Sequence, residues 1–297
     1  MANRGILAAV GAYLLWGLLP VYWKLLQEVA ATEILAHRML WSFVFMMGLM
    51  AWHRNWGWLK TAVTQPRTLL LFVTSATLLG VNWLTYIWAT NNGYIVDASL
   101  GYFINPLVNV LLGVIFLRER PRRGQWLAIG VAIVGVVYLA LSYGVVLWIS
   151  LTLAFTFAIY GLLRKTATLN SREGLTLETA VFFLPALVYL LLLERSGTAA
   201  LGHISWSISS LLIFTGAATS IPLLLFASGA RQVTLTTLGI LQYIAPSLQF
   251  LIGVVIYDEP FTLARLIGFA IIWLALAIYS GETIWRRRQR RFVMRPH

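Results

Sequence analysis

The sequence predicts an all-α integral membrane protein in which ten transmembrane helices form two inverted five-helix repeats. Three observations lead to this fold class: an apolar composition, ten apolar segments of membrane-spanning length, and a long internal repeat. Of the 297 residues, 60% are hydrophobic and only 11% are charged, and the mean hydropathy is +0.80. A soluble domain of this length keeps a much larger share of charged residues on its surface. The chain is therefore expected to reside in a lipid bilayer.

Ten apolar segments follow one another along the chain with short connections. A transmembrane helix needs about 20 predominantly apolar residues. We expect the spans at residues 4–23, 31–52, 69–90, 97–117, 124–142, 145–163, 175–193, 208–230, 236–257 and 263–284. The first segment is long and aromatic and lacks a small-residue cleavage site, so we interpret it as a retained helix and not as a signal peptide.

The chain also resembles itself at an offset of 140 positions. Residues 102–119 (YFINPLVNVLLGVIFLRE) align without a gap with residues 242–259 (QYIAPSLQFLIGVVIYDE), and Pro106 then coincides with Pro246. The string LWGLL in the first span also matches IYGLL in the sixth, at an offset of 144 positions. An internal repeat of this length predicts two structural units. We place the first repeat at residues 4–142, the second at 145–284 and a basic tail at 285–297.

The positions of Lys and Arg predict the orientation of the spans. Most of the 22 basic residues fall in alternate connections, and the opposite connections hold only Lys24, Arg195 and Arg265. Because cytoplasmic loops carry the excess of basic residues, both termini are predicted to be cytoplasmic. Five is an odd number, so the second repeat must cross the membrane in the opposite direction to the first. Such inverted repeats are typical of transporters that open alternately to each side of the membrane.

Several strings resemble a known family. They are the Trp16–Gly17 pair in the first span, HRMLWSF around Arg38, SLGYFINPLVNVLLG and LGILQYIAP. These strings resemble the EamA domain of the drug/metabolite transporter superfamily and, within it, the RarD branch. Two copies of the domain would cover nearly the whole chain. The resemblance implies a ten-helix permease or exporter of small molecules in the bacterial inner membrane. In the second copy Phe183 replaces Arg38, so the arginine has no counterpart.

Polar and aromatic side chains inside the spans are the candidate substrate ligands. Tyr102, Asn105 and Asn109 lie at i, i+3 and i+7 on one helical face, and the offset maps them to the ninth span. Two such faces suit a cavity between the repeats, although hydrogen bonds between helices would also satisfy the amides. Aromatic walls with a few amides suit a small amphipathic solute. The full candidate set is Tyr102, Asn105, Asn109, Gln242, Tyr243, Gln249, Asn82, Tyr86, Trp16, Tyr160 and Arg38.

Arg38 has two interpretations. It is the only basic residue well inside a predicted span, where a charge costs about 2.5–3.5 kcal/mol. It either binds a carboxylate or phosphate of the substrate, or extends to the outer interface and pairs with Glu33 or helix-end carbonyl groups. The missing counterpart in the second repeat favours the structural interpretation.

Small residues recur every fourth position in the fifth span, at Gly124, Ala128 and Ala132, and Ala264 and Gly268 occupy the corresponding sites in the tenth span. Such a face allows close helix packing. It predicts either a contact between these two spans or a homodimer interface.

Missing motifs narrow the function. The chain has no Cys, no GxxxxGK[ST] phosphate-binding loop and no HExxH or GxSxG motif. We therefore expect no enzymatic activity, no cofactor and no metal. We expect the basic tail to contact anionic membrane lipids and not nucleic acid. The prediction is a secondary transporter for a small-molecule substrate, acting as a monomer or homodimer, with a channel or a lipid flippase as alternatives.

Overall fold

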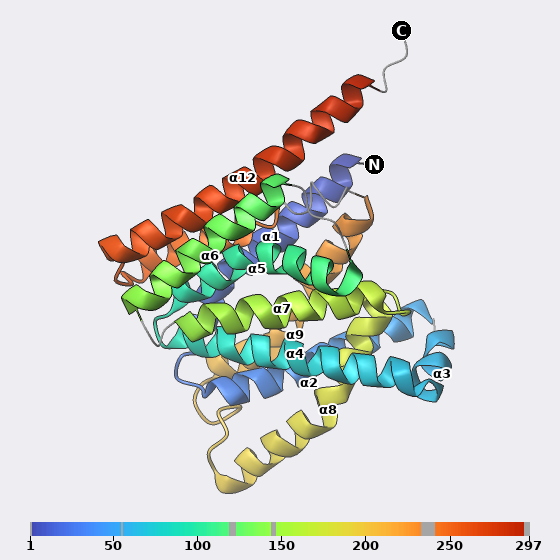
Figure 1. The fold of residues 1–297 in the computed structure, drawn as a ribbon. Helices are drawn as coiled ribbons and strands as arrows, with labels where there is room; N and C mark the ends of the chain where they lie inside the picture. The colour runs from blue at the N-terminus through green and yellow to red at the C-terminus, as the bar shows by residue number, and fades with distance from the viewer. Residues whose placement is uncertain (1, 55, 119–122, 144–146, 233–240, 294–297) are drawn as a thin grey trace.

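A computed structural model describes residues 2–54, 56–118, 123–143, 147–232 and 241–293, and all regular elements in these ranges are helical (Figure 1). The first half of the chain contains α1 (Ala2–Lys24), α2 (Ala31–His53), α3 (Gly57–Thr64), α4 (Pro66–Asn91), α5 (Ile95–Leu117) and α6 (Arg123–Tyr143). The second half contains α7 (Leu147–Thr166), α8 (Ser171–Ser196), α9 (Trp206–Gln232), α11 (Ile244–Leu251), the π-helical segment η2 (Ile252–Ile256) and α12 (Leu263–Val293).

Within the described residues, eight helices are long and apolar enough to cross a membrane, namely α1, α2, α4, α5, α7, α8, α9 and α12. Two shorter apolar helices, Arg123–Leu139 and Ile244–Ile256, coincide with the fifth and ninth predicted spans. The first residues of the ninth predicted span, 236–240, lie outside the described part of the chain. The all-helical fold class is confirmed.

Two segments differ from the sequence prediction. The helix α3 was not expected; it packs because Trp58 and Ala62 bury their side chains against Met50 and Phe72. In addition, α12 continues without interruption to Val293, so the predicted boundary between the second repeat and the basic tail is not a helix end. Figure 1 shows this long helix extending out of the bundle toward the C-terminus.

Helix boundaries follow local sequence signals. Asn170 caps α8 by accepting hydrogen bonds from the backbone N–H groups of Arg172 and Glu173, and Glu173 in turn accepts the N–H of Asn170. Gly197 ends the same helix with a left-handed φ of +71°. Proline also occurs inside helices, as at Pro20 in α1, where the missing N–H leaves the carbonyl group one turn earlier without its usual donor.

The helices pack in matching pairs. In the first half, α1 packs against α9 and α11, while in the second half α7 packs against α4 and α5. If α1 corresponds to α7, α4 to α9 and α5 to α11, these two sets of contacts are equivalent. Two further major contacts, α6 with α12 and α2 with α8, join helices that correspond to each other, while α2 also packs extensively against α9.

The small residues of α6 lie in its contact with α12. Gly124 lies directly against Glu282, and Gly268 of α12 lies directly against Leu139. Ala128 and Ala132 are buried in the same cluster as several apolar side chains of α12. The prediction that these residues join the two helices is confirmed.

Candidate functional site

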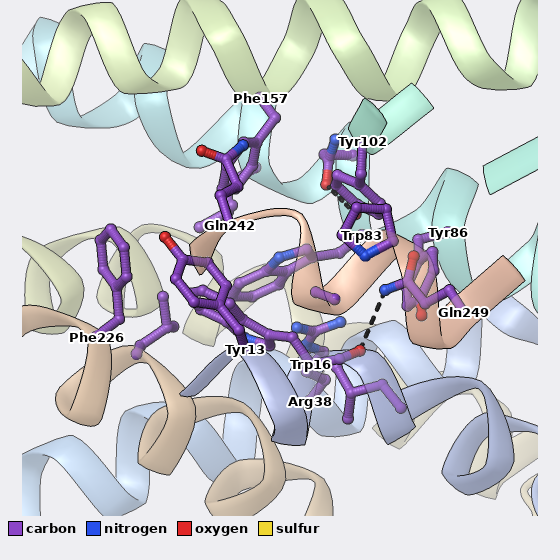
Figure 2. A pocket seen from close by; sticks show the side chains of 16 residues that line it. Tyr13, Trp16, Arg38, Trp83, Tyr86, Tyr102, Phe157, Phe226, Gln242 and Gln249 are labelled. Atoms are coloured by element: carbon purple, nitrogen blue, oxygen red, sulfur yellow. Dashed lines mark hydrogen bonds between the residues drawn. The ribbon is translucent and has the colours of Figure 1, made fainter. Parts of the chain in front are cut away.

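A cavity of about 110 Å³ lies between helices of both halves of the chain (Figure 2). It is lined by side chains of α1, α2, α4, α5, α7 and α9, and by residues just before and within α11. Seven of its lining residues belong to the candidate set from the sequence: Trp16, Arg38, Asn82, Tyr86, Tyr102, Gln242 and Gln249. Seven of the sixteen lining residues are aromatic and five are aliphatic, and the wall also has three amide groups and one guanidinium group.

Asn82 connects three helices beside this cavity. Its Nδ2 donates to the backbone oxygen of Leu153 and to the hydroxyl of Thr156, both at 3.0 Å, while its Oδ1 accepts from the Tyr102 hydroxyl at 3.2 Å. The Tyr102 ring also packs edge-on against Tyr86, with 5.7 Å between centroids. These bonds hold α4, α5 and α7 together and fix the phenol of Tyr102 at the cavity wall.

Gln249 is positioned by the proline in α1. Its Nε2 donates to the backbone oxygen of Trp16 at 3.1 Å (Figure 2). In a regular helix the N–H of residue 20 would bind this oxygen, but Pro20 has no N–H to offer. The amide therefore completes the hydrogen bonding of α1 from the other half of the chain.

Asn105 was predicted to line the cavity, but the structure places it behind the wall. It is fully buried, and its Nδ2 donates to the backbone oxygen of Ala154 at 3.0 Å. Its Oδ1 accepts from Gln242 at 3.2 Å and from Asn109 at 3.0 Å. Asn105 thus orients Gln242, which does line the cavity, while Asn109 is exposed and lies outside the lining. Tyr102, Asn105 and Asn109 lie on one face of α5 but in different environments, because α7 covers the part of this face that carries Asn105.

Tyr160 and Tyr243 are not among the lining residues either. The hydroxyl of Tyr160 donates to the buried carboxylate of Glu178 at 3.4 Å, next to a shorter bond of 2.7 Å from Ser75. The ring of Tyr243 stacks on Phe103, with 6.4 Å between centroids. Both tyrosines are occupied by contacts between helices.

Arg38 lines the cavity and is only 3% exposed. Its guanidinium carbon lies 3.7 Å from the ring centroid of Trp83 and 5.1 Å from that of Trp23. The expected pairing with Glu33 is not found, because Glu33 instead accepts the backbone N–H of Ala200 at 2.7 Å. The interpretation that Arg38 extends to the outer interface was therefore wrong: two indole rings, supplied by α1 and α4, hold it inside the protein.

Nine lining residues are outside the candidate set from the sequence, and four of them are aromatic. Phe157 and Phe226 both contribute to the wall. In the internal repeat, Phe157 aligns with Tyr13, and Phe226 aligns with Tyr86. The offset of 140 positions could therefore have found Phe226 from Tyr86, whereas Phe157 follows only from the alignment of LWGLL with IYGLL. The other lining residues outside the candidate set are Tyr13, Leu19, Leu79, Trp83, Leu223, Ala245 and Pro246.

Beyond the cavity, at the end where α5 begins, charged side chains connect the two halves. The carboxylate of Glu259 accepts the backbone N–H groups of Ile95 at 2.7 Å and of Val96 at 2.8 Å. Nearby, Arg265 donates to Asp97 at 3.3 Å. The three charged side chains are each at most 8% exposed. Within the described ranges, no three His, Asp or Glu residues come together as a metal site would require.

Comparisons with known proteins agree with this architecture. Residues 3–141 match the model of the EamA-like transporter family. The protein RarD of Escherichia coli (strain K12) is 45% identical over 287 residues, which cover 97% of each chain. The uncharacterized transporter YojE of Bacillus subtilis (strain 168) is 43% identical over 293 residues, covering 96% of each chain.

One solved crystal structure is similar in fold, with a TM-score of 0.62 and 20% sequence identity. The similarity covers 94% of this chain and 97% of the other. At this identity it bears on the fold alone. The family match and the near full-length relatives show that the chain belongs to the EamA-like transporter family, among its RarD-type membrane transporters.

Proposed function

We propose that the protein is a secondary transporter, a permease or exporter, that moves a small amphipathic metabolite or drug-like molecule by alternating access. The observation that carries this proposal is the central cavity, which draws its aromatic and amide lining from both halves of the chain. A site between two repeats can be exposed to either side when the repeats rock against each other.

Matched helix contacts support the inverted repeat. The pairs α1–α11 and α7–α5 are equivalent under the offset, and so are α1–α9 and α7–α4. Aligned side chains also meet at the cavity, such as Tyr86 with Phe226. Two similar halves of opposite orientation provide two conformations of comparable energy, as alternating access requires.

The bonds of Glu259 and Asp97 support a conformation that is closed at one end. They link the two halves beyond the cavity, at the end that the distribution of basic residues assigns to the outside. Breaking these bonds and forming others at the cytoplasmic end would expose the cavity to the outside. This is the exchange of contacts that a rocking mechanism needs.

The transport proposal is tested by measuring flux. Purified protein is first screened by thermal shift with amino acids, nucleosides, organic anions and phenicols. A stabilising compound is then followed into proteoliposomes. We expect saturable uptake that unlabelled compound inhibits. Ion conduction without saturation would favour the alternative of a channel, and transfer of labelled lipid between leaflets would favour a flippase.

The proposed location is the bacterial inner membrane, with both termini cytoplasmic and the basic tail against anionic lipids, in a monomer or homodimer. Because the chain has no Cys, single cysteines are clean reporters of topology. Gln65 and Glu28 are both exposed, at opposite ends of the helices. We expect Gln65→Cys to react with an impermeant thiol reagent only from the cytoplasm, and Glu28→Cys only from the outside. The reverse pattern would overturn the orientation.

A further inference from the structure

The guanidinium group of Arg38 faces the cavity in an environment that leaves it incompletely satisfied. Trp83 and Trp23 cover its faces through ring contacts of 3.7 Å and 5.1 Å. Such contacts stabilise a cation, but they provide no acceptor for the N–H groups at its edges. A buried cation without an acceptor is strongly destabilising.

No acceptor in the described part of the chain reaches Nε or Nη1 of Arg38, although both atoms are buried. The carboxylate that is closest along the helix, Glu33, is already used. It accepts the N–H of Ala200 at 2.7 Å and lies 3.8 Å from Nε2 of His37. In the described part of the chain, therefore, no carboxylate pairs with Nε or Nη1 of Arg38.

The charge of the cavity lining also favours an anionic ligand. Its sixteen residues include Arg38 but no Asp, Glu, Lys or His, so the wall carries a formal charge of +1. Aromatic walls have a low dielectric constant and strengthen the electrostatic interaction between this charge and a ligand. The cavity therefore favours an anionic ligand over a cationic one. A single positive charge matches a monoanion better than a doubly charged phosphate, which would require a second cation.

The remaining wall defines the body of the ligand. Tyr13, Trp16 and Phe226 form an aromatic cluster, with ring centroids between 5.5 and 5.9 Å apart. A cavity of about 150 Å³ holds benzene in a model protein, so the volume of about 110 Å³ here limits the ligand to about the size of one ring or a short chain. Gln242 and Asn82 supply the remaining polar contacts.

We propose that Arg38 binds the carboxylate of a small organic acid whose apolar body lies against the aromatic cluster of Tyr13, Trp16 and Phe226. This inference rests on the proposed function, since it names the class of solute that the same cavity takes. In this proposal Arg38, which has no counterpart in the second repeat, selects an anionic substrate.

The test compares four probes of similar shape on the purified full-length protein: phenylacetate, phenylacetamide, phenethylamine and benzylphosphonate. Thermal shift and calorimetry measure binding. We expect phenylacetate to stabilise the wild type in a concentration-dependent manner and the neutral amide and the amine to have no effect. Measured at a pH above its second pKa, where it is a dianion, benzylphosphonate should bind more weakly than phenylacetate. Tighter binding would show that the site prefers a phosphate-like group to a carboxylate.

Substitutions of Arg38 test whether this residue is responsible for the binding of phenylacetate. Arg38→Gln should abolish the response to phenylacetate, and Arg38→Lys should weaken binding about tenfold or more, because a lysine lacks the planar group that stacks on Trp83. The matched control is Arg195→Gln, which removes an exposed arginine at the end of α8 and should bind phenylacetate like the wild type.

Equal binding of phenylacetate and phenylacetamide by the wild type would overturn the inference, and this comparison needs no variant to fold. Binding of phenylacetate that persists in Arg38→Gln would also overturn it, as would the failure of all four probes to bind. The transport proposal fails separately: it is lost if phenylacetate binds through Arg38 but no solute crosses proteoliposomes. If a neutral solute shows saturable flux that Arg38→Gln leaves unchanged, the transport proposal stands and the carboxylate-site proposal is wrong.

Discussion

Gly216→Ala is expected to lower the thermal stability of the protein, although alanine is the better helix former. Gly216 lies in α9 where this helix meets α2, and a Cβ atom built there would be 2.5 Å from the carbonyl carbon of Trp41. Backbone atoms cannot turn aside as a flexible side chain can, so the two helices must separate. Overpacking of this kind costs about 1–3 kcal/mol, which outweighs the helix propensity gain of up to about 1 kcal/mol.

The matched control is Gly48→Ala in α2, where an added Cβ atom meets no atom within 4 Å. We expect this variant to melt at or above the temperature of the wild type. Gly216→Val should be less stable than Gly216→Ala, because it adds more volume at the same contact. Thermal denaturation in detergent, followed by loss of the monodisperse chromatographic peak, measures all three. A Gly216→Ala variant as stable as Gly48→Ala would contradict the close contact of α2 and α9.

Glu259→Gln is expected to open the outer side of the cavity. The carboxylate binds two N–H groups in the first turn of α5, a helix whose own N-cap residue, Tyr94, makes no side-chain cap bond. Hydrogen bonds to a charged group contribute about 1.5–3 kcal/mol each, and a negative charge suits the positive end of a helix. The loss of one such bond is enough to shift a conformational equilibrium about tenfold.

A cysteine placed in the cavity reports this shift. In the Ala245→Cys background, an impermeant thiol reagent added from the outside should react faster when Glu259 is replaced by glutamine. Asp258→Asn is the matched control, because Asp258 is the neighbouring acid, is exposed, and has a left-handed φ of 49° that asparagine tolerates. Equal labelling rates in the two variants would show that Glu259 does not hold the outer side closed.

The sequence predicted the fold class more accurately than the site. Apolar length and the repeat offset located the described helices to within a few residues, apart from α3 and the extension of α12. Both signals are local, because a membrane-spanning helix satisfies its backbone within its own segment. Within the described residues, the ninth span also departs from a regular α-helix, because α11 continues directly into the π-helical segment η2.

The candidate site was only partly predictable, and α5 illustrates why. Its helical period correctly placed Tyr102, Asn105 and Asn109 on one face. Only Tyr102 reaches the cavity, because α7 receives the amide of Asn105, and Asn109 lies further along the helix. Helical periodicity gives the direction in which a side chain points around the axis of its own helix. It gives no information on which neighbouring helix covers that side chain at a given depth.

Arg38 shows the same division between sequence and tertiary structure. The sequence by itself determined that a basic residue lies inside a span, that the chain is apolar and repeated, and that basic residues are unevenly distributed between its connections. Only the tertiary structure decided that Trp23 and Trp83 enclose this arginine and that it faces the shared cavity. The physical reason is that hydrophobic length and charge act within one segment, whereas the partner of a buried polar group depends on how separate helices pack.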